Sequence, residues 1–251
     1  MSRFNKWAML VKKMDMNIIP DWQYDELKQV GIDYSELSEV QAYDSQMQKL
    51  RDFKKERSDF MNSTGLTHDQ TVLEIGTGTG ELALEIARYC SKVFVTDVSP
   101  TMLQFARQKA HDRNVRNIEF HERGFLTYMH AGEHLDIIVS QLAFHHLPDF
   151  WKLIALKRIY SMLTKGGKFY LRDVVYSFNG DHNEFFKNWI NGVKGAAGEA
   201  MAKDLATSIK EEYYTSDWIM EGLLQRAGFI IEKAEYKDGF MAVYLCSKAE
   251  D

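Results

Sequence analysis

The sequence predicts an α/β fold in which a mostly parallel sheet is covered by helices on both faces. An apolar run at 72–75 leads into three alternate glycines and then into apolar residues at helical spacing, as in a strand, a tight turn and a helix. A second apolar strand, 92–97, is followed by another helical pattern. The run 135–140 is almost wholly apolar, as expected of a strand covered on both faces. Strands that alternate with helices favour a parallel sheet.

The turn that carries Gly76, Gly78 and Gly80 predicts a site for a nucleotide-like cofactor. Without Cβ atoms the turn can take unusual dihedral angles, and a ligand can approach the backbone close to the N-terminus of the next helix. A dinucleotide fingerprint needs glycine at its first, third and sixth positions, and here Glu81 occupies the sixth. Nicotinamide and flavin cofactors are therefore disfavoured.

Two carboxylates complete the pattern around the glycine turn. Asp97 ends the second strand, where it can accept hydrogen bonds from both hydroxyls of a ribose, and Glu74 precedes the turn, where dinucleotide binders have no such acid. With these residues the chain resembles the class I S-adenosylmethionine-dependent methyltransferases. Glu74-x-Gly76-x-Gly78-x-Gly80 matches their first motif, and Asp97 followed by 99–103 matches their second. Residues 135–147 and 163–169 are similar to the family's fourth strand and to its turn before strand five.

The resemblance covers roughly residues 60 to 250 and implies a complete architecture. The expected fold is a doubly wound, seven-stranded, mostly parallel, Rossmann-like sheet with strand order 3-2-1-4-5-7-6 and strand 7 reversed. Residues 1–56 are expected to form an N-terminal helical lid or extension, and 57–251 the methyltransferase domain. Within that domain, 176–215 is expected to be an insertion that shapes the substrate pocket.

Residues 1–56 are rich in aromatic side chains, too apolar for a disordered tail. Met47, Leu50, Phe53 and Phe60 recur at a spacing that predicts one amphipathic helix over 44–60. A docked helical extension and a lid over the cofactor both fit this pattern. The resemblance favours the lid and brings Tyr43 close to the pocket.

The resemblance implies a set of residues around the cofactor, S-adenosylmethionine, and its product S-adenosylhomocysteine. These residues are Glu74, Gly76, Thr77, Gly78, Gly80, Asp97, Val98, Met102, Gly124, Phe125 and Gln141. Ser99 and Pro100 predict the start of the helix that carries Met102. Strand three, 117–121, is followed by Arg123-Gly124, where the family commonly has Gly-Asp. The acid that binds adenine is therefore missing. Backbone groups and Phe125, or Glu122 if the loop shifts, must replace it.

Catalytic residues are not fixed by the sequence, and the candidates are His145, His146 and Tyr43. The histidine pair follows strand four at the ligand-binding edge of the sheet. One histidine of the pair is commonly structural in similar enzymes, so a structural role and a general base both remain open. No cluster of Cys, Asp or Glu lies at ligand spacing beside them, so no metal site is predicted.

The substrate end of the site is expected to come from the later part of the chain. The substrate-binding candidates are Tyr43, Arg172, His182, Trp189, Tyr213 and Tyr214. Arg172 has a second interpretation, an internal ion pair or loop anchor with Asp173. Residues 150–163 predict an amphipathic helix that Gly166 ends as a left-handed cap. Residues 229–231 and 240–246 predict a terminal antiparallel hairpin.

The length, charge and cysteine content of the chain limit the kinds of partner and compartment that are expected. A chain of 251 residues suits one α/β domain with an accessory segment, and a net charge of −5 with interspersed signs gives no basic face for nucleic acid. The only cysteines, Cys90 and Cys246, favour a reducing compartment. The first residues show no signal peptide or membrane-spanning pattern, so a cytoplasmic protein without membrane contact is predicted. The oligomeric state is open.

The predicted function is transfer of the methyl group of S-adenosylmethionine to a small-molecule acceptor, through an O, N or C nucleophile. Residues 140–143 are Ser-Gln-Leu-Ala, without the Asn/Asp-Pro-Pro-Tyr/Phe motif of enzymes that methylate amino groups of nucleic acids or of protein glutamine. The alternative is a non-catalytic S-adenosylmethionine-binding module or regulatory protein. The absence of the acid that commonly binds adenine after strand three supports this alternative. A nucleotide-dependent oxidoreductase is a second alternative that the glycine spacing disfavours.

Overall fold

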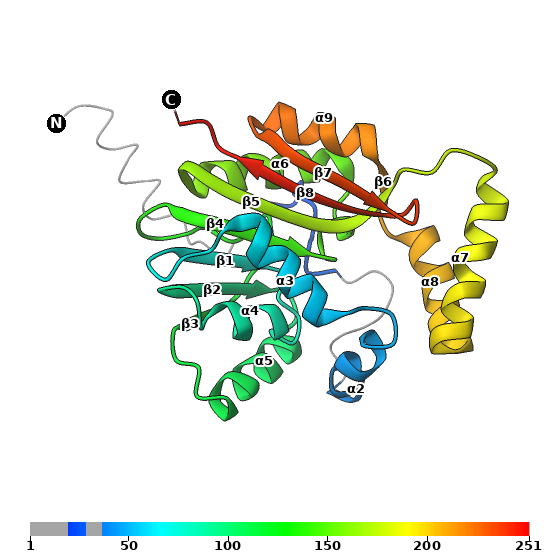
Figure 1. Cartoon of the computed structure of the whole chain (residues 1–251), viewed down its shortest axis with the longest axis horizontal. Helices are drawn as coiled ribbons and strands as arrows, with labels where there is room; N and C mark the ends of the chain where they lie inside the picture. The colour runs from blue at the N-terminus through cyan, green and yellow to red at the C-terminus, as the bar shows by residue number, and fades with distance from the viewer. Residues whose placement is uncertain (1–19, 29–36, 251) are drawn as a thin grey trace.

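A single twisted sheet organises the molecule, whose computed structural model describes residues 20–28 and 37–250. The strands lie in the order β3-β2-β1-β4-β5-β8-β7 (Figure 1). Five neighbouring strands are parallel to one another: β1 (Thr71–Ile75), β2 (Lys92–Asp97), β3 (Ile118–Glu122), β4 (Leu135–Gln141) and β5 (Leu163–Tyr176). This arrangement confirms the predicted doubly wound α/β fold.

The terminal hairpin supplies the reversed strand. β8 (Met241–Ser247) is antiparallel both to β5 and to β7 (Ile230–Lys237). The two-residue strand β6 (Thr215–Ser216) pairs in parallel with the end of β5 and lies off the main path. Without β6 in the count, the observed order is the expected 3-2-1-4-5-7-6.

The core divides into two hydrophobic clusters, one on each face of the sheet. Alternate residues of β1 show the division, because Val72 packs into one cluster and Leu73 into the other. Helices α6 (Asp149–Met162) and α9 (Asp217–Ala227) cover the face of Leu73. Helices α3 (Phe53–Thr64) and α4 (Glu81–Ile86) cover the opposite face, where the Phe60 ring meets the Tyr170 ring edge-on.

Helix α5 (Pro100–Asp112) begins as predicted. The Ser99 hydroxyl accepts a hydrogen bond from the Met102 amide at 3.2 Å, and Pro100 occupies the first turn. Its buried stripe is the one that the sequence predicts, Met102, Leu103, Ala106 and Ala110.

The single helix predicted over 44–60 is wrong, because the segment forms two helices. Helix α2 (Leu37–Met47) ends, the chain turns, and α3 begins after Asp52, whose carboxylate accepts a hydrogen bond from the Lys55 amide at 3.0 Å. A new cap in the middle of the apolar pattern therefore divides it. The predicted boundary at 56/57 falls inside α3, and residues 1–19 and 29–36 of the predicted lid lie outside the described residues.

The predicted glycine cap at the end of α6 is also wrong. The helix ends at Met162, and Leu163 is already extended, with φ −77° and ψ 144°, because it pairs with Leu135 of β4. Gly166 has a φ of +70° but lies within β5, where its amide donates a hydrogen bond to the Lys248 carbonyl. The glycines therefore shape the start of the strand.

The insertion at 176–215 forms a helical hairpin of α7 (His182–Ala197) and α8 (Glu199–Glu211). Figure 1 shows it on the side of the sheet toward which the arrowheads of β1, β2 and β4 point, the side on which α2 also lies. Aromatic side chains hold the hairpin to the β7–β8 turn, since the Trp189 and Phe240 rings stack with centroids 4.0 Å apart. Among the described residues, none of the helices combines the length and the hydrophobicity of a membrane-spanning segment.

Candidate cofactor and substrate site

A cavity of about 610 Å³ lies where the carboxyl ends of the central strands meet α2 and the α7–α8 hairpin. Its volume falls in the ordinary range for small-molecule sites, about 300 to 1,000 Å³. The predicted site residues that line it are Tyr43, Glu74, Gly76, Thr77, Gly78, Asp97, Val98, Met102, Gly124, Phe125, Gln141, His145, His146, Arg172, Trp189 and Tyr214. Residues from distant parts of the sequence thus meet at one edge of the sheet.

The glycine turn differs in function from one glycine to the next. Gly76 has a φ of +76°, and a Cβ atom there would overlap the Cβ of Ala143. Gly78 also has a positive φ, +53°, yet a Cβ atom there would meet nothing within 4 Å. Gly76 is therefore needed for packing against the loop after β4, whereas Gly78 leaves space beside the cavity.

Asp97 ties the glycine turn to the end of β2. Its carboxylate accepts hydrogen bonds from the Gly78 amide at 2.7 Å and from the Ser99 amide at 2.9 Å. Burial raises the pKa of Asp97, although these backbone hydrogen bonds act in the opposite direction. The carboxylate that is expected to bind a ribose is thus held in place by the backbone of the turn.

Glu74 is buried beneath the same turn. Burial raises its pKa to about 8, and its carboxylate accepts a hydrogen bond from the Thr77 hydroxyl at 2.8 Å. This contact organises the turn from below.

Helix α2 is fastened to the cofactor end of the cavity through Asp44. The Asp44 carboxylate accepts hydrogen bonds from the Thr79 hydroxyl at 2.6 Å and from the Lys109 ammonium at 2.7 Å. Burial raises the pKa of the neighbouring Tyr43, and its environment includes the charges of Arg51 and Asp97. The contacts of Asp44 therefore hold Tyr43 at the wall of the cavity.

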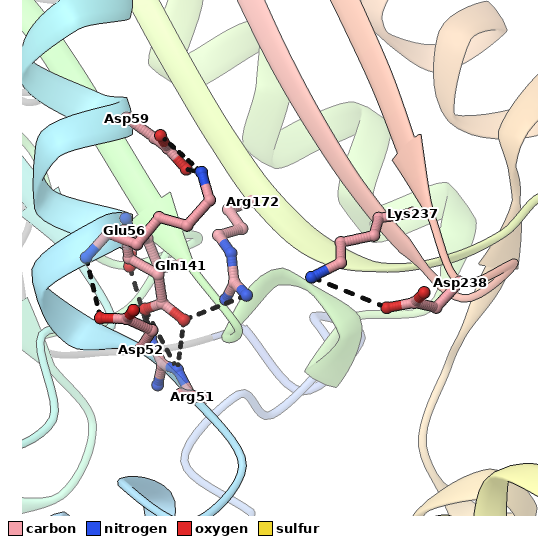
Figure 2. Close-up of polar contacts among 9 residues, drawn as sticks. Arg51, Asp52, Glu56, Asp59, Gln141, Arg172, Lys237 and Asp238 are labelled. Atoms are coloured by element: carbon pink, nitrogen blue, oxygen red, sulfur yellow. Dashed lines mark hydrogen bonds and ion pairs between the residues drawn. The ribbon is translucent and has the colours of Figure 1, made fainter.

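A second polar cluster joins the α2–α3 turn to the ends of β4 and β5. Figure 2 shows Glu56 between two arginines, with Arg51 at 2.6 Å and Arg172 at 3.1 Å. Arg51 also donates a hydrogen bond to the side-chain amide oxygen Oε1 of Gln141 at 3.4 Å. Among the described residues, the buried Nη1 of Arg172 and Nε2 of Gln141 have no hydrogen-bond partner. The cluster has two cations for one carboxylate, and two of its donors remain unsatisfied.

The loop after β3 receives a carboxylate from an unexpected part of the chain. Glu26 is buried, and its carboxylate accepts hydrogen bonds from the Leu126 amide at 2.9 Å and from the Thr127 hydroxyl at 2.6 Å. A Cβ atom at Gly124 would overlap this carboxylate. Glu26 lines the cavity. An acid therefore lies next to the position where the sequence lacks one.

The histidine pair lies on the short 3₁₀ helix η1 (Phe144–His146), and its first member is buried between two carboxylates. His145 Nδ1 lies 2.5 Å from the Asp173 carboxylate, which also accepts a hydrogen bond from the Phe144 amide at 2.7 Å. Burial lowers the pKa of His145, but the negative charges of Asp173 and Glu212 outweigh burial and raise it. Burial, together with the nearby His145, lowers the pKa of His146 to about 3.

Three predicted site residues do not line the cavity. Gly80 is backed by Ala106, where a Cβ atom would be 3.0 Å from the Ala106 Cβ. His182 begins α7 on its exposed side, and the Tyr213 ring meets the Tyr24 ring edge-on at 6.1 Å.

The sequence interpretation missed several residues that line the cavity, namely Glu26, Arg51, Glu56 and Glu212. In the sequence, Arg51 and Glu56 have the pattern of residues on the solvated face of one continuous helix. The break between α2 and α3 instead brings them to the cavity. Glu212 lies between Glu211 and Tyr213 without any motif.

Comparisons with known proteins agree with this geometry. Residues 72–167 match the methyltransferase domain family. An uncharacterized methyltransferase of Bacillus velezensis is 32% identical over 168 residues, which cover 66% of this chain and 73% of that protein.

Solved structures share the fold at lower identity. A SAM-dependent methyltransferase from Aquifex aeolicus has a TM-score of 0.58 at 18% identity, over 84% of this chain and 98% of its own. The [4+2]-cyclase SpnF has a TM-score of 0.61 at 15% identity, over 78% of this chain and 81% of its own. From the identity and coverage of its Bacillus relative, together with the motifs and the fold, we conclude that the chain belongs to the class I S-adenosylmethionine-dependent methyltransferases.

Proposed function

We propose that this methyltransferase transfers the methyl group of S-adenosylmethionine to a small-molecule acceptor within the cavity described above. The observation that carries the proposal is the continuity of the cavity, which is lined at once by the glycine turn and by the α7–α8 hairpin. A site for the cofactor and a site for an acceptor would then share one space.

The cofactor end of the proposal rests on four features of the described residues. The open space at Gly78 admits a ligand against the backbone, and Asp97 offers carboxylate oxygens at the end of β2. The unsatisfied donors of Arg172 and Gln141 suit a carboxylate, which the methionine part of the cofactor carries. The loop at Gly124, with Glu26 beside it, would bind the adenine. The donor set therefore fits the group.

The acceptor end is proposed from the side chains contributed by the hairpin. Trp189, Met201, Leu205 and Tyr214 line the cavity and give it an apolar, aromatic wall. Such a wall suits a compact organic acceptor, because small-molecule sites are lined mainly by apolar and aromatic side chains. Within this proposal, Tyr43 and Arg172, which line the same cavity, contact the acceptor as well.

S-adenosylmethionine supplies a methyl group already activated by its sulfonium, so the protein needs mainly to align the acceptor and exclude water. Tyr43 and the Arg51–Glu56–Arg172 cluster would orient the two ligands, and α2 with the hairpin would close over them. The buried His145 is held by Asp173 and positions the loop after β4.

The test combines binding with turnover. Calorimetry with S-adenosylhomocysteine should give one binding site, and a panel of small hydroxyl, amine, thiol and carbon acids should contain an acceptor that converts S-adenosylmethionine to S-adenosylhomocysteine. The variant Gly78→Val is the matched control and should abolish both signals. Binding without turnover of any acceptor would favour the alternative of a non-catalytic binding module.

The cytoplasmic location and the absence of nucleic acid and membrane partners belong to this proposal. Both cysteines, Cys90 and Cys246, are buried and free, which supports a reducing compartment.

A further inference from the structure

The fold brings a carboxylate to the histidine pair. The side chains of His145, His146 and Glu212 each offer one ligand atom, and these three atoms all lie within 4.8 Å of one another. All three residues line the cavity. Two imidazoles and one carboxylate form a ligand set of catalytic zinc sites, which keep a fourth position open for water or substrate.

The separation between His145 and Glu212 suits two ligands of one ion. His145 Nε2 lies 3.5 Å from the Glu212 carboxylate, which is longer than a normal N–H···O hydrogen bond of about 2.7 to 3.2 Å. Ligands bound tetrahedrally at about 2.0 to 2.1 Å from zinc are separated by roughly 3.4 Å from one another. The ligand atom of His146 lies within 4.8 Å of the other two, and His146 lines the same cavity.

The surroundings of His145 match those of a metal-bound histidine. Its Nδ1 is engaged by the buried Asp173, so Nε2 is the nitrogen left toward Glu212. Such a carboxylate fixes the ring orientation of a histidine ligand and increases its basicity. Asp173 is itself held by the Phe144 amide, and the Tyr214 ring packs against His145 with centroids 5.3 Å apart. The ring therefore has little freedom to turn away.

We propose that His145, His146 and Glu212 bind a divalent cation of the zinc class, with its open coordination position toward the cavity. This inference deepens the proposed function, on which its second part rests: the acceptor is a molecule whose nucleophilic atom can coordinate zinc, with a thiol as the best match. A thiol that took the open position would bind as the thiolate and release one proton to the solvent. Methyl transfer would then break the S–CH₃ bond of the cofactor and form the S–CH₃ bond of the product.

The first experiment measures metal binding without any cofactor. The full chain is treated with a chelator, dialysed and titrated with Zn²⁺ in a calorimeter, and Co²⁺ is used separately for its tetrahedral absorption spectrum. We expect one equivalent of metal to bind. His146→Ala and Glu212→Gln should weaken binding at least tenfold, while Glu211→Gln, at the exposed neighbour of Glu212, should leave it unchanged. Circular dichroism checks that each variant is folded.

Several outcomes would overturn the site. They are no binding of Zn²⁺ by the wild-type chain, equal affinities in Glu212→Gln and Glu211→Gln, or a Co²⁺ spectrum without tetrahedral bands. The last measurement needs no variant, so a folding failure cannot hide the answer. Calorimetry with S-adenosylhomocysteine on the same samples separates the two proposals, because normal cofactor binding without metal binding removes only the metal site.

The acceptor is tested with 2-mercaptoethanol and other small thiols. Methylation of a thiol should fall at least tenfold after chelation and return when one equivalent of Zn²⁺ is added. Thiol methylation that is unaffected by chelation, or a panel in which only non-coordinating acceptors react, would overturn the acceptor part of the inference.

Discussion

Asp97 holds the glycine turn through two backbone amides, and its carboxylate borders the cavity. Replacing Asp97 with Ala removes the proposed acceptor of the ribose hydrogen bonds and the anchor of the turn together. Affinity for S-adenosylhomocysteine should fall by roughly 1.5 to 3 kcal/mol for each charged hydrogen bond lost. Calorimetry measures the change, with Asp97→Asn as the variant that keeps the shape. If Asp97→Ala binds S-adenosylhomocysteine with unchanged affinity, Asp97 does not contact the cofactor.

Gly76 and Gly78 form a matched pair for a second prediction. In Gly76→Ala the new methyl group meets Ala143, so unfolding free energy should fall by about 1 to 3 kcal/mol. In Gly78→Val the side chain enters open space, so the protein should stay folded, with a modest loss of stability from its positive φ, but should not bind cofactor. Thermal unfolding and calorimetry distinguish the two effects. The assignment fails if both variants lose stability equally or if Gly78→Val binds normally.

The buried Glu74 predicts a pH effect on stability. Its pKa is raised to about 8 in the folded chain, from 4.5 in the unfolded chain, chiefly by burial. The folded chain therefore binds the proton more tightly, and this contribution to stability is complete below about pH 4.5 and is lost as pH rises to about 8. In Glu74→Gln the melting temperature should decline less between pH 5 and 8.5. Parallel declines in the variant and the wild type would show that Glu74 ionises normally.

At the scale of elements, local signals predicted some boundaries and missed others for physical reasons. Ser99 and Pro100 start α5 because capping involves only neighbouring residues. The end of α6 could not be found in the same way, because Leu163 is extended by its pairing with Leu135 in another part of the chain. The break between α2 and α3 depends on Asp52, a cap inside an apolar pattern that looked continuous. The sheet order followed from the family resemblance rather than from periodicity.

The contacts of helix α2 predict how readily the proposed lid opens. Asp44 joins it to Thr79 in the glycine turn and to Lys109 of α5, so the helix should open more often when this carboxylate is lost. In Asp44→Ala, amide hydrogen exchange across 37–47 should become faster, and added S-adenosylhomocysteine should restore only part of the protection. Asp52→Ala, at the cap of α3, controls for a general loss of helix stability.

The lid proposal also makes a prediction for the whole N-terminal segment. Amides in 20–56 should be more protected with S-adenosylhomocysteine than without it, and deletion of residues 1–40 should reduce turnover more than stability, because water would reach the site. Equal protection in both states, together with a fully active truncated chain, would leave the segment as a structural extension.

For the whole molecule, the cavity combines predicted and unpredicted residues. The glycine turn and Asp97 could be predicted because each belongs to a motif contained within a short stretch of sequence. Glu26, Arg51 and Glu212 do not, because they reach the cavity only through the path of the N-terminal segment and the hairpin. The family is confirmed, and the acceptor remains a proposal, since acceptor contacts come from those same parts.

The position of the α7–α8 hairpin predicts that a mutation in it will affect binding of the acceptor but not binding of the cofactor. Trp189 stacks on Phe240 and lines the cavity beside Met201 and Leu205. Trp189→Ala should raise KM for the acceptor at least severalfold and leave the Kd for S-adenosylhomocysteine within about twofold. Leu223→Ala, on the distant helix α9, controls for loss of stability. Loss of cofactor affinity in Trp189→Ala would show that the hairpin serves both ligands.

The attachment of the hairpin has a consequence for how such an enzyme changes over generations. Between the end of β5 and the short β6, the chain leaves the sheet for α7 and α8 and returns to the same strand, since Thr215 pairs with Val175. Its entry and exit thus lie side by side, and mutations inside the excursion leave the seven-strand framework and the glycine turn intact. New chemistry could therefore be acquired by replacing this one excursion, as in a cassette exchange, while the methyl donor is kept.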